Sequence, residues 1–416
     1  MSQSDQKLQT LKGFRDFLPA EKRKRDWAIS QLKKVFEQYG FDPIETPTVE
    51  YQAVLLGKYG EEAEKLMYTF EDHGKRKVGL RYDQTVPTAR FLSQHSHKLP
   101  RYFRRYQIQN VFRAENTQAG RFREFLQCDC DVFGSESTIA DAEILAVFYR
   151  AYVALGISSF EIKLNDRTVL FDKLTPFATE SVSVLSIIQS IDKIDKIKEQ
   201  GVLAELESKG ISQDKGKQLI EALQSAKPSE SLEEIIDHAV ALDVPRKALV
   251  FNPFLARGLD YYTGLIFEGV IPEYGAGSVG AGGRYDHLIS SLGGPEIPAV
   301  GFAIGFDRTI EALEALAILP DLEASSHVLV TVFSHELTAE SLKAAAAIRT
   351  NGINVEVYPV EDKLGKQIKY ADDKKIPFVV IIGPDEAEKN IVSVKNMKTG
   401  EEKKGSIEEV VHTLSS

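Results

Sequence analysis

The sequence predicts an α+β protein with three parts: a core built on an antiparallel sheet, a helical insertion within that core, and a C-terminal α/β domain. Three observations lead to this prediction. Residues 111–134 have the pattern of two strands joined by a polar loop, residues 167–253 are poor in glycine and rich in helix formers, and residues 327–416 alternate strands with helices. Consecutive strands joined by a short loop pair antiparallel, whereas strand–helix–strand units form parallel pairs.

The first part, residues 1–165, mixes helices and strands. Apolar residues recur at helical spacing between Trp27 and Phe36, which predicts a helix there. A second helix is predicted over Ala140–Leu155 and should end at Gly156, because glycine readily adopts the left-handed conformation found after helix C-termini. The segment ISSFEIKLND that follows alternates in the manner of a strand.

The segment VFRAENTQAGRFREFLQCDCDVFG, residues 111–134, concentrates charged side chains on predicted strands. Successive side chains on a strand point to opposite faces. Arg113 and Glu115 should therefore share a face before the turn at Gly120. Beyond the turn, one face is polar and the opposite face is apolar, with the members Arg123, Gln127, Asp129 and Asp131 against Leu126, Cys128, Cys130 and Val132.

A polar row of this kind is costly to bury unless a ligand or partner satisfies it. Arginine presents a planar, permanently charged fork that suits phosphates, and the carboxylates and glutamine suit a polar cation. The row therefore predicts neighbouring sites for a nucleotide and a charged small molecule. The alternative is a salt-bridged hairpin without a ligand.

The second part, residues 166–249, reads as short amphipathic helices interrupted by Gly and Pro. The core then resumes over residues 250–320. Five glycines between Gly275 and Gly283 indicate tight backbone near a ligand or a flexible loop, and a helical period follows Gly305. We interpret residues 166–249 as an insertion into a core formed by residues 1–165 and 250–320.

The third part, residues 326–416, follows a linker with the sequence PDLEASS. It reads as a βαβαβ unit with a final helix, SIEEVVHTL, which predicts a separate α/β domain with a largely parallel sheet. No phosphate-binding glycine loop appears in it. Its sequence pattern alone fits either a small-molecule binder or a scaffold.

The composition excludes several classes of protein. A net charge of −10 over 416 residues argues against wholesale coating of nucleic acid, although local clusters of basic residues remain. These clusters are Lys22–Arg25, interpreted as a solvated face, then Arg101, Arg104 and Arg105, and then the lysines between Lys363 and Lys375. The sequence shows neither the apolar core of a signal peptide nor a stretch that would span a membrane.

The two cysteines, Cys128 and Cys130, cannot by themselves form a disulfide framework or a zinc site. They are predicted to be reduced core residues, in keeping with a cytoplasmic chain.

Several segments resemble the conserved motifs of class II aminoacyl-tRNA synthetases. FEQYGFDPIETPTVE resembles motif 1, residues 111–134 resemble motif 2, and Phe306–Asp307–Arg308 in AVGFAIGFDR resembles motif 3. LARGLDYYTG at Leu255–Gly264 and AGGRYD at Ala281–Asp286 are similar to the histidyl-tRNA synthetase family, as is LRYDQTVPTAR. The resemblance begins at LKGFRDFLP and runs to the last domain, with the motifs in the family's order.

The resemblance implies a class II catalytic core, a C-terminal anticodon-binding-like domain and the activity of a histidine–tRNA ligase. The carboxylate of L-histidine would attack the α-phosphate of ATP to form histidyl-adenylate, and the 3′ end of tRNA(His) would then accept the histidyl group. Chemistry at phosphorus needs alignment and charge neutralisation more than an acid–base pair. Mg²⁺ is the expected counter-ion of the ATP phosphates, with no protein metal site.

Residue roles follow from the resemblance. Arg113 and Arg257 would be catalytic, with Arg113 on the α-phosphate and the attacking carboxylate and Arg257 as a second cation there. Glu115 would accept a hydrogen bond from the adenine amino group. Arg121 and Arg308 would hold the γ-phosphate end of ATP; a surface ion pair is the alternative for Arg308, which should lie at a helix N-terminus, itself an anion site.

The histidine pocket is implied by further residues of these segments. Asp83 and Thr85 would bind the amino group. Asp131, on the polar face with Gln127, would pair with either the ring or the ammonium group. The other members of the pocket are Arg257, Tyr261, Tyr262 and Tyr285. A site that hydrogen-bonds its substrate rejects analogues lacking that group by about 10⁴–10⁵, so no editing domain is expected. Gln84 is expected to point away from Asp83 and Thr85, without consequence for the chemistry.

Motif 1 of this class implies a homodimer with a two-fold contact, and no membrane partner is expected. Two alternatives remain. One is a non-catalytic, histidine-binding regulatory paralogue of histidine biosynthesis, which lacks the C-terminal domain and has eroded motifs. The other is a prolyl or threonyl class II synthetase, which the segments LARGLDYYTG and AGGRYD disfavour.

Overall fold

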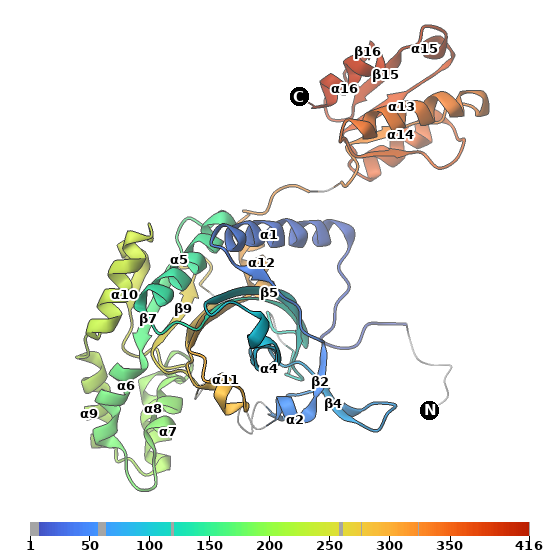
Figure 1. The fold of residues 1–416 in the computed structure, drawn as a ribbon. Coiled ribbons are helices and arrows are strands. Elements are labelled where there is room, and N and C mark those ends of the chain that lie inside the picture. Colours follow the sequence, from blue (N-terminus) through green and yellow to red (C-terminus); the bar gives the residue numbers. More distant parts are fainter. Residues whose placement is uncertain are drawn as a thin grey trace. The chain divides into compact units, whose positions relative to one another are not determined.

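The computed structural model of the chain describes residues 8–56, 64–117, 120–257, 261–275, 277–322 and 324–415. The chain divides into two units (Figure 1). The larger contains Met1–Phe17 and Arg25–Leu319, and the smaller contains Leu18–Lys24 and Pro320–Ser416.

The larger unit is built on an eight-stranded sheet in the order β1-β5-β6-β11-β10-β9-β7-β8. All neighbours pair antiparallel except at the two edges, where β1 with β5 and β7 with β8 are parallel. The strands are β1 Asp42–Pro43, β5 Phe103–Phe112, β6 Glu124–Phe133, β7 Glu161–Asp166, β8 Leu249–Phe251, β9 Leu265–Val270, β10 Ser278–Arg284 and β11 Ala299–Gly305. The predicted antiparallel core is confirmed.

One face of this sheet carries helices α1, α5, α10 and α12 (Figure 1). Their bounds are α1 Pro19–Gln38, α5 Thr138–Ala154, α10 Glu230–Ala241 and α12 Phe306–Ala315. In α1 the buried positions Ala28, Leu32, Val35 and Phe36 lie at helical spacing, so a single stripe faces the core. Both predicted helices are confirmed, and Gly156 follows α5 with a φ of +91°, as its position suggested.

The opposite face carries α4, Thr85–His95, together with the helices that follow β7. These are α6 Arg167–Leu174, η3 Thr175–Phe177, α7 Val184–Ile191, α8 Ile194–Lys209 and α9 Gln213–Gln224. The predicted helical character of this stretch is confirmed. Its last helix, α10, shares the core of the first face with α5, so the stretch packs on both sides of the sheet.

A small antiparallel sheet, β2-β4-β3, precedes α4. Its strands and the remaining short elements of this unit are β2 Val49–Tyr51, α2 Gln52–Leu55, β3 Thr69–Glu71, β4 Lys77–Leu80, η2 Ser96–Lys98, η4 Arg246–Ala248 and α11 Leu288–Ser291. Strand β4 is followed directly by the turn that begins α4, and this turn carries Asp83 of the candidate site.

The smaller unit contains a five-stranded sheet in the order β13-β12-β14-β15-β16. Its elements are β12 Val328–Val330, η5 His335–Leu337, α13 Thr338–Thr350, β13 Val355–Val357, α14 Leu364–Asp373, β14 Phe378–Ile381, α15 Pro384–Glu388, β15 Val392–Asn396, β16 Glu402–Gly405 and α16 Ile407–Ser415. The predicted strand–helix alternation is confirmed for β12 to β14, which pair parallel.

The expectation of a largely parallel sheet in this unit is wrong. β15 pairs antiparallel with β14, and β16 pairs antiparallel with β15, so two of the four pairings are antiparallel. The polar edge strand β16, with the sequence EKKG, is exposed along most of its length, and an exposed strand lacks the apolar alternation by which strands are recognised.

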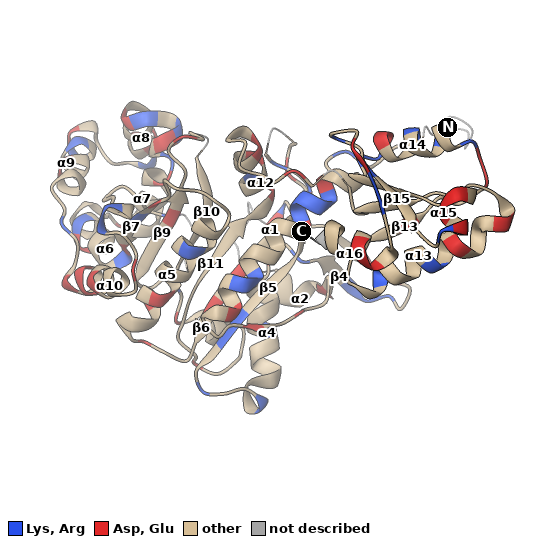
Figure 2. Cartoon of the chain, turned by 90° about the horizontal axis from the view of Figure 1, so that it is seen from above, with Lys and Arg blue, Asp and Glu red and all other residues tan. Residues whose placement is uncertain are grey.

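Within the described part of the chain, no helix combines the length and apolarity needed to cross a membrane. Figure 2 shows Lys and Arg interspersed with Asp and Glu over the helices of both units.

Candidate functional site

Gln127, Asp129 and Asp131 of the predicted polar row lie on one face of β6, which pairs with β5 as the third and second strands of the sheet. In the register of β5 and β6, Arg105 lies opposite Asp131, Gln107 opposite Asp129, and Gln109 opposite Gln127. The intervening residues Cys128, Cys130 and Val132 are buried in the core of the other face. The predicted division into an apolar and a polar face is therefore confirmed, and the polar row is doubled by a matching row on β5.

A buried ion cluster lies in this row. Arg105 is completely buried, and its Nη2 lies 2.6 Å from Oδ2 of Asp131 and 4.0 Å from Oδ2 of Asp129. The hydroxyl of Tyr285 donates to Oδ1 of Asp131. Burial raises the pKa of both carboxyls, and the Arg105 guanidinium opposes that rise. Arg105 thus offsets part of the cost of burying two acids.

The interpretation of Arg105 as part of an exposed basic cluster is wrong. Arg101 is exposed, whereas Arg104 forms an ion pair with Glu143. Arg105 lies on the opposite face of β5 from Arg104, where the acids of the neighbouring strand β6 lie beside it.

Glycine makes room for this cluster on the next strand. Gly301 of β11 lies opposite Asp131, and a Cβ atom at Gly301 would overlap Oδ1 of that carboxyl. A Cβ atom at Gly282 of β10 would in turn overlap the carbonyl oxygen of Gly301. The glycine-rich segment predicted from the sequence is therefore tight backbone beside the candidate site.

The start of α4 lies over the same face. The backbone N–H of Val86 donates to Oδ1 of Asp83 at 3.2 Å, so this carboxylate satisfies a free donor at the helix N-terminus. Thr85 is the first residue of the helix. Asp83 also raises the pKa of Tyr261, after the larger effect of burial, which indicates that the two side chains are neighbours.

Gln84 has a structural role that the sequence did not reveal. It is fully buried, and its Nε2 donates to the backbone oxygens of Gln109 at 3.1 Å and Gln127 at 2.8 Å. It therefore ties the start of α4 to β5 and β6. These bonds help to hold the turn that carries Asp83 and Thr85, while the expectation that Gln84 does not change the chemistry stays a prediction.

Three tyrosines wall the cluster. The ring centroids of Tyr261 and Tyr262 are 4.7 Å apart, and those of Tyr261 and Tyr285 are 5.9 Å apart. Burial raises the pKa of the Tyr261 and Tyr285 hydroxyls, which therefore stay protonated and act as donors at neutral pH. The tyrosines predicted for the pocket are thus brought together with Asp83 and Asp131.

Arg257 reaches this group from the segment LARGLDYYTG, of which residues 258–260 lie outside the described residues. Its Nη1 lies 2.6 Å from Oε1 of Glu268 on β9. Its backbone φ is +37°, an uncommon value for a residue with a side chain. Its Nε is buried without a hydrogen-bond partner among the described residues, so one donor of the guanidinium is free for a ligand.

The arginines expected to bind phosphate lie at the other end of the polar row, near the motif 2 loop. Arg113 donates from Nε to the carbonyl oxygen of Tyr82 at 3.1 Å, and its guanidinium lies 4.3 Å from the centre of that ring. Arg121 lies 3.8 Å from Glu115, and its side chain is 43% exposed. The site therefore holds two partly accessible cations where the loop returns to the sheet.

Arg308 is the third cation on this side. It lies in the first turn of α12, directly after β11, as predicted. Its Nη1 donates to the carbonyl oxygen of Ser278 at 2.7 Å. A Cβ atom on Gly120 would lie 3.9 Å from Arg308 Nε and 2.9 Å from Glu311 Oε2. The loop that carries Arg121 and the start of α12 are therefore adjacent.

The N-terminal segment contacts both the start of α12 and the residues that lead from the loop into β6. We call its contacts at Asp307 the clip. Oδ1 of Asp307 accepts hydrogen bonds from Arg15 at 2.5 Å and from Arg25 at 2.7 Å, and its Oδ2 accepts from the backbone N–H of Leu126 at 2.9 Å. The carbonyl of Gly13 accepts from the N–H of Arg123 at 2.9 Å. The interpretation of Lys22–Arg25 as a solvated face is wrong for Arg25, which is buried.

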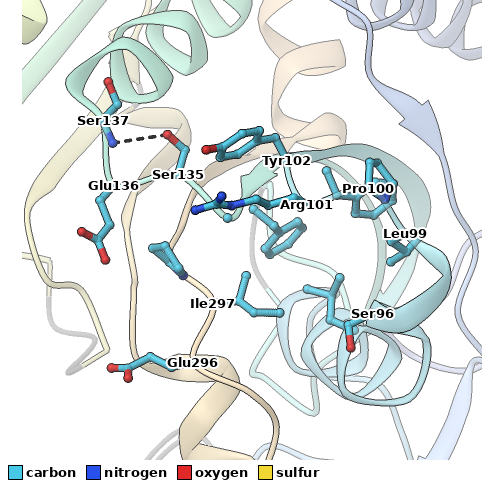
Figure 3. A pocket seen from close by; sticks show the side chains of 15 residues that line it. Ser96, Leu99, Pro100, Arg101, Tyr102, Ser135, Glu136, Ser137, Glu296 and Ile297 are labelled. Carbon is cyan, nitrogen blue, oxygen red and sulfur yellow. Dashed lines mark hydrogen bonds between the residues drawn. The ribbon is translucent and has the colours of Figure 1, made fainter.

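A pocket of 560 Å³ lies at the far end of β5 and β6 from Gln127 (Figure 3). Its floor includes Phe103 and Phe133, and the side chains of Arg101 and Glu136 lie around it. None of the residues predicted for the site lines it. The candidate site is therefore defined by its buried polar cluster rather than by this cavity.

The sequence reasoning missed Arg105, Glu268, Gln84 and the clip at Asp307. A signal for Arg105 was present, because Arg105, Gln107 and Gln109 alternate with Tyr106 and Ile108 in the way that marks a polar strand face. Glu268 and Asp307 had no such signal, since each meets its partner only through the folding of distant segments.

A mainly antiparallel sheet, with partly accessible arginines at one end of its polar row and a buried cluster of acids and tyrosines beside them, is the arrangement expected of a class II aminoacyl-tRNA synthetase catalytic core. Residues 13–309 match the family described as Histidyl-tRNA synthetase, and residues 327–416 match the one described as Anticodon binding domain. The chain belongs to the histidyl-tRNA synthetase family.

Individual relatives agree with this assignment. The chain is 40% identical to the histidine–tRNA ligase of Wolinella succinogenes over 95% of both proteins, and 38% identical to that of Clostridium tetani over 98% of both. It also superposes on the crystal structure of histidyl-tRNA synthetase from Nostoc sp. PCC 7120 with a TM-score of 0.85 and 33% identity, covering 98% of this chain and 99% of the other.

Proposed function

We propose that this chain activates L-histidine with ATP to form histidyl-adenylate and transfers the histidyl group to the 3′ end of tRNA(His). The activity of a histidine–tRNA ligase follows from the family to which the chain belongs. The observation that carries the proposal for the site is the polar row itself, where a buried acid–tyrosine cluster and partly exposed arginines occupy one face of β5 and β6.

In the first step, the protein's task is to align two anions, the histidine carboxylate and the α-phosphate. We assign Arg113 to both of them and Arg257 to the α-phosphate, so that these cations offset the charge that develops on phosphorus. Support for Arg257 comes from its buried Nε, which has no partner among the described residues. Glu115 is assigned to the adenine amino group, and Arg121 and Arg308 to the γ-phosphate.

For histidine recognition, we assign Asp83 and Thr85 to the amino group. Gln127, Asp131 and the tyrosines 261, 262 and 285 form the rest of the pocket. Support comes from the buried Oε1 of Gln127, an acceptor without a hydrogen-bond partner in the described part of the chain, because a native structure rarely leaves such an atom unsatisfied unless a ligand meets it.

Mg²⁺ is proposed as the counter-ion of the ATP phosphates. The described residues contain no cluster of three or more His, Cys, Asp or Glu side chains placed to hold a metal ion, so the ion would be held mainly by phosphate oxygens and water, as Mg²⁺ prefers. The carboxylate of Glu311, which like Arg308 lies close to Gly120, fits such a water shell. Bound there, the ion would neutralise charge on the leaving diphosphate.

We further propose that residues 326–416 bind tRNA(His) and that residues 166–249 form a domain inserted into the catalytic core of residues 1–165 and 250–320. Support for tRNA binding is the match of residues 327–416 to an anticodon-binding family. The five lysines Lys363, Lys366, Lys369, Lys374 and Lys375 are all exposed. Two of them already form ion pairs, Lys366 with Asp362 and Lys374 with Glu356.

A cytoplasmic location is proposed because both cysteines are free and buried.

Pyrophosphate exchange with each of the twenty amino acids tests the function. Exchange of labelled pyrophosphate into ATP should require histidine and Mg²⁺. A chain that exchanges with proline or threonine but not with histidine would be another class II synthetase. A chain that binds histidine but exchanges with none would be the regulatory paralogue.

A homodimer is proposed from motif 1, whose strand β1 lies at the edge of the large sheet. Light scattering at micromolar concentration should give twice the mass of 46.3 kDa. A monomer under these conditions would contradict the proposal.

A further inference from the structure

Asp129 is a buried acid with a carboxylate oxygen that makes no hydrogen bond to the described part of the chain. The side chain is 2% exposed, and its Oδ1 is buried with no hydrogen-bond partner among the described residues. Its Oδ2 lies 4.0 Å from the nearest guanidinium nitrogen of Arg105, beyond hydrogen-bond distance. A buried carboxylate in this state costs free energy that some other group must offset.

Asp131 lies two residues further along the same face of β6, and its carboxylate oxygens have closer polar neighbours than those of Asp129. One of its oxygens accepts the hydroxyl of Tyr285, and the other lies 2.6 Å from Arg105. Oδ2 of Asp131 makes no hydrogen bond with the described residues, but its charge is balanced by this close ion pair. Of the two acids, Asp129 is the one whose unpartnered oxygen has no cation close beside it.

Asp129 lies beside Gln127, which is assigned to the histidine pocket. Gln127 precedes it by two residues on the same face, so the two side chains start about 6.6 Å apart and can reach one ligand atom between them. After burial, Arg105 and Asp131, the charges of Asp83 and Arg113 also act on the pKa of the Asp129 carboxyl, so both groups are within electrostatic range of it.

We propose that Asp129 is a substrate-contacting residue, whose Oδ1 accepts a hydrogen bond from the α-ammonium group of histidine together with Oε1 of Gln127. An ammonium group carries three donors and one positive charge, which matches two unpartnered acceptors and an unbalanced carboxylate. This inference rests on the proposed function and assigns Asp131 to the tyrosine side of the pocket, with Arg105 as its counter-ion.

The alternative is that Asp129 serves only as a second counter-ion of Arg105. In that case its partner would be the guanidinium alone, and removing the charge would affect every ligand of the pocket alike. The two readings therefore differ in which part of the substrate senses Asp129.

The experiment compares two histidine analogues by calorimetry on the full-length chain. Histidinol keeps the ammonium group and lacks the carboxylate, whereas imidazole-4-propionate lacks the ammonium group. In Asp129→Asn, histidinol should bind about 10- to 100-fold more weakly, as expected for losing a hydrogen bond to a charged group. Binding of imidazole-4-propionate and the KM for ATP should change less than about twofold.

Asp72→Asn is the matched control, because Asp72 forms an exposed ion pair with Arg76 outside the site. It should bind both analogues as the wild type does. Unchanged histidinol binding by Asp129→Asn would overturn the inference, and so would equal weakening of both analogues. The proposed function is tested separately on the wild-type chain. If the wild type binds histidinol and exchanges pyrophosphate with histidine, the proposed function stands whatever the variant does. If the wild type does neither, both the proposed function and the inference are contradicted.

A crystal structure of the wild-type chain with histidinol covers the case in which the variant does not fold. An ammonium nitrogen within about 3.2 Å of Asp129 Oδ1 would support the contact, and one beyond about 4 Å would overturn it.

Discussion

At the scale of single residues, the site depends on charges that are buried and paired. Arg105 lies under Asp129 and Asp131, and Arg257 is paired with Glu268. A buried ion pair contributes little net stability, but removing one partner leaves the other charge uncompensated. Variants at these positions should therefore report on both stability and chemistry, and the two effects can be separated.

Replacing Arg257 by alanine tests its assignment to the α-phosphate. Loss of one electrostatic donor should lower the rate of adenylate formation by about 10²–10³, while histidine affinity should change much less. Single-turnover adenylation and equilibrium histidine binding measure the two quantities. Glu268→Gln is the control, since it breaks the same 2.6 Å pair but keeps the arginine. Near-normal adenylation by Arg257→Ala would make Arg257 a structural ion pair.

Replacing Arg105 by methionine should destabilise the catalytic unit by about 3–5 kcal/mol, because the acids it faces would lose their buried counter-ion. Urea unfolding followed by the fluorescence of Trp27 measures this change. Arg104→Met, which removes a partly exposed partner of Glu143 on the other face of β5, should cost about 1 kcal/mol or less. Equal effects of the two variants would contradict the burial described for Arg105.

At the scale of elements, the site is assembled by contacts that join the ends of strands and helices. Asp307 links the N-terminal segment, the start of β6 and α12. Arg284, at the end of β10, forms an ion pair with Asp141 of α5 at 2.9 Å and with Asp286 at 3.0 Å. Asp307 and Arg284 each contact several elements at once, so substitutions there should act at a distance from the side chain that is changed.

Asp307→Ala would leave Arg25 buried without its carboxylate and the N–H of Leu126 without its acceptor. We expect a loss of about 3–5 kcal/mol in the stability of the catalytic unit. Because α12 carries Arg308, the KM for ATP should also rise, while histidine binding stays within about twofold. Urea titration and steady-state pyrophosphate exchange measure these effects. A variant with normal stability and a normal KM for ATP would show that Asp307 neither stabilises the catalytic unit nor positions Arg308.

Asp141 should give the catalytic unit a distinctive dependence on pH. Burial raises the pKa of its carboxyl from 3.8 to about 6, and Arg284 opposes the rise. The folded state therefore binds this proton more tightly than the unfolded state, and the stability it contributes is present below pH 4 and is lost as the pH rises through about 6.

The difference in unfolding free energy between Asp141→Asn and the wild type should therefore shift in favour of the variant by about 1–1.5 kcal/mol between pH 5 and pH 7.5. Urea unfolding at both pH values measures it. A difference that does not change with pH would mean that Arg284 keeps Asp141 ionised throughout this range.

At the scale of the whole molecule, the residues assigned to activation and those assigned to tRNA binding belong to different units. Every residue proposed for ATP or histidine lies between Asp83 and Arg308, in the larger unit, whereas the exposed lysines near α14 lie in the smaller one. The division predicts that the two steps of the reaction respond differently to removal of the smaller unit.

A chain that ends near Ser325 should still form histidyl-adenylate, provided that it folds and dimerises. It should charge tRNA poorly, mainly through weaker tRNA binding, and that binding should depend less steeply on salt because fewer phosphate contacts remain. Pyrophosphate exchange, aminoacylation and tRNA binding at several salt concentrations test this. If a well-folded truncated dimer charges tRNA as well as the full chain, residues 326–416 are not the tRNA-binding domain proposed here.

Local patterns in the sequence were sufficient for many of the helices and strands and for the two faces of β6. The alternation through Gln127, Cys128, Asp129 and Cys130 and the helical spacing in α1 each depend on neighbours along the chain, and both were confirmed. Strands β15 and β16 were missed, and β16 is an exposed edge strand that lacks such a pattern.

Tertiary structure alone decided which charges meet. Arg25, Arg105 and Gln84 were interpreted from their neighbours in sequence, and each proved to be buried against a distant segment. The physical reason is that the cost of burying a polar group is set by the partner that satisfies it, and that partner is brought close only when the whole sheet has formed.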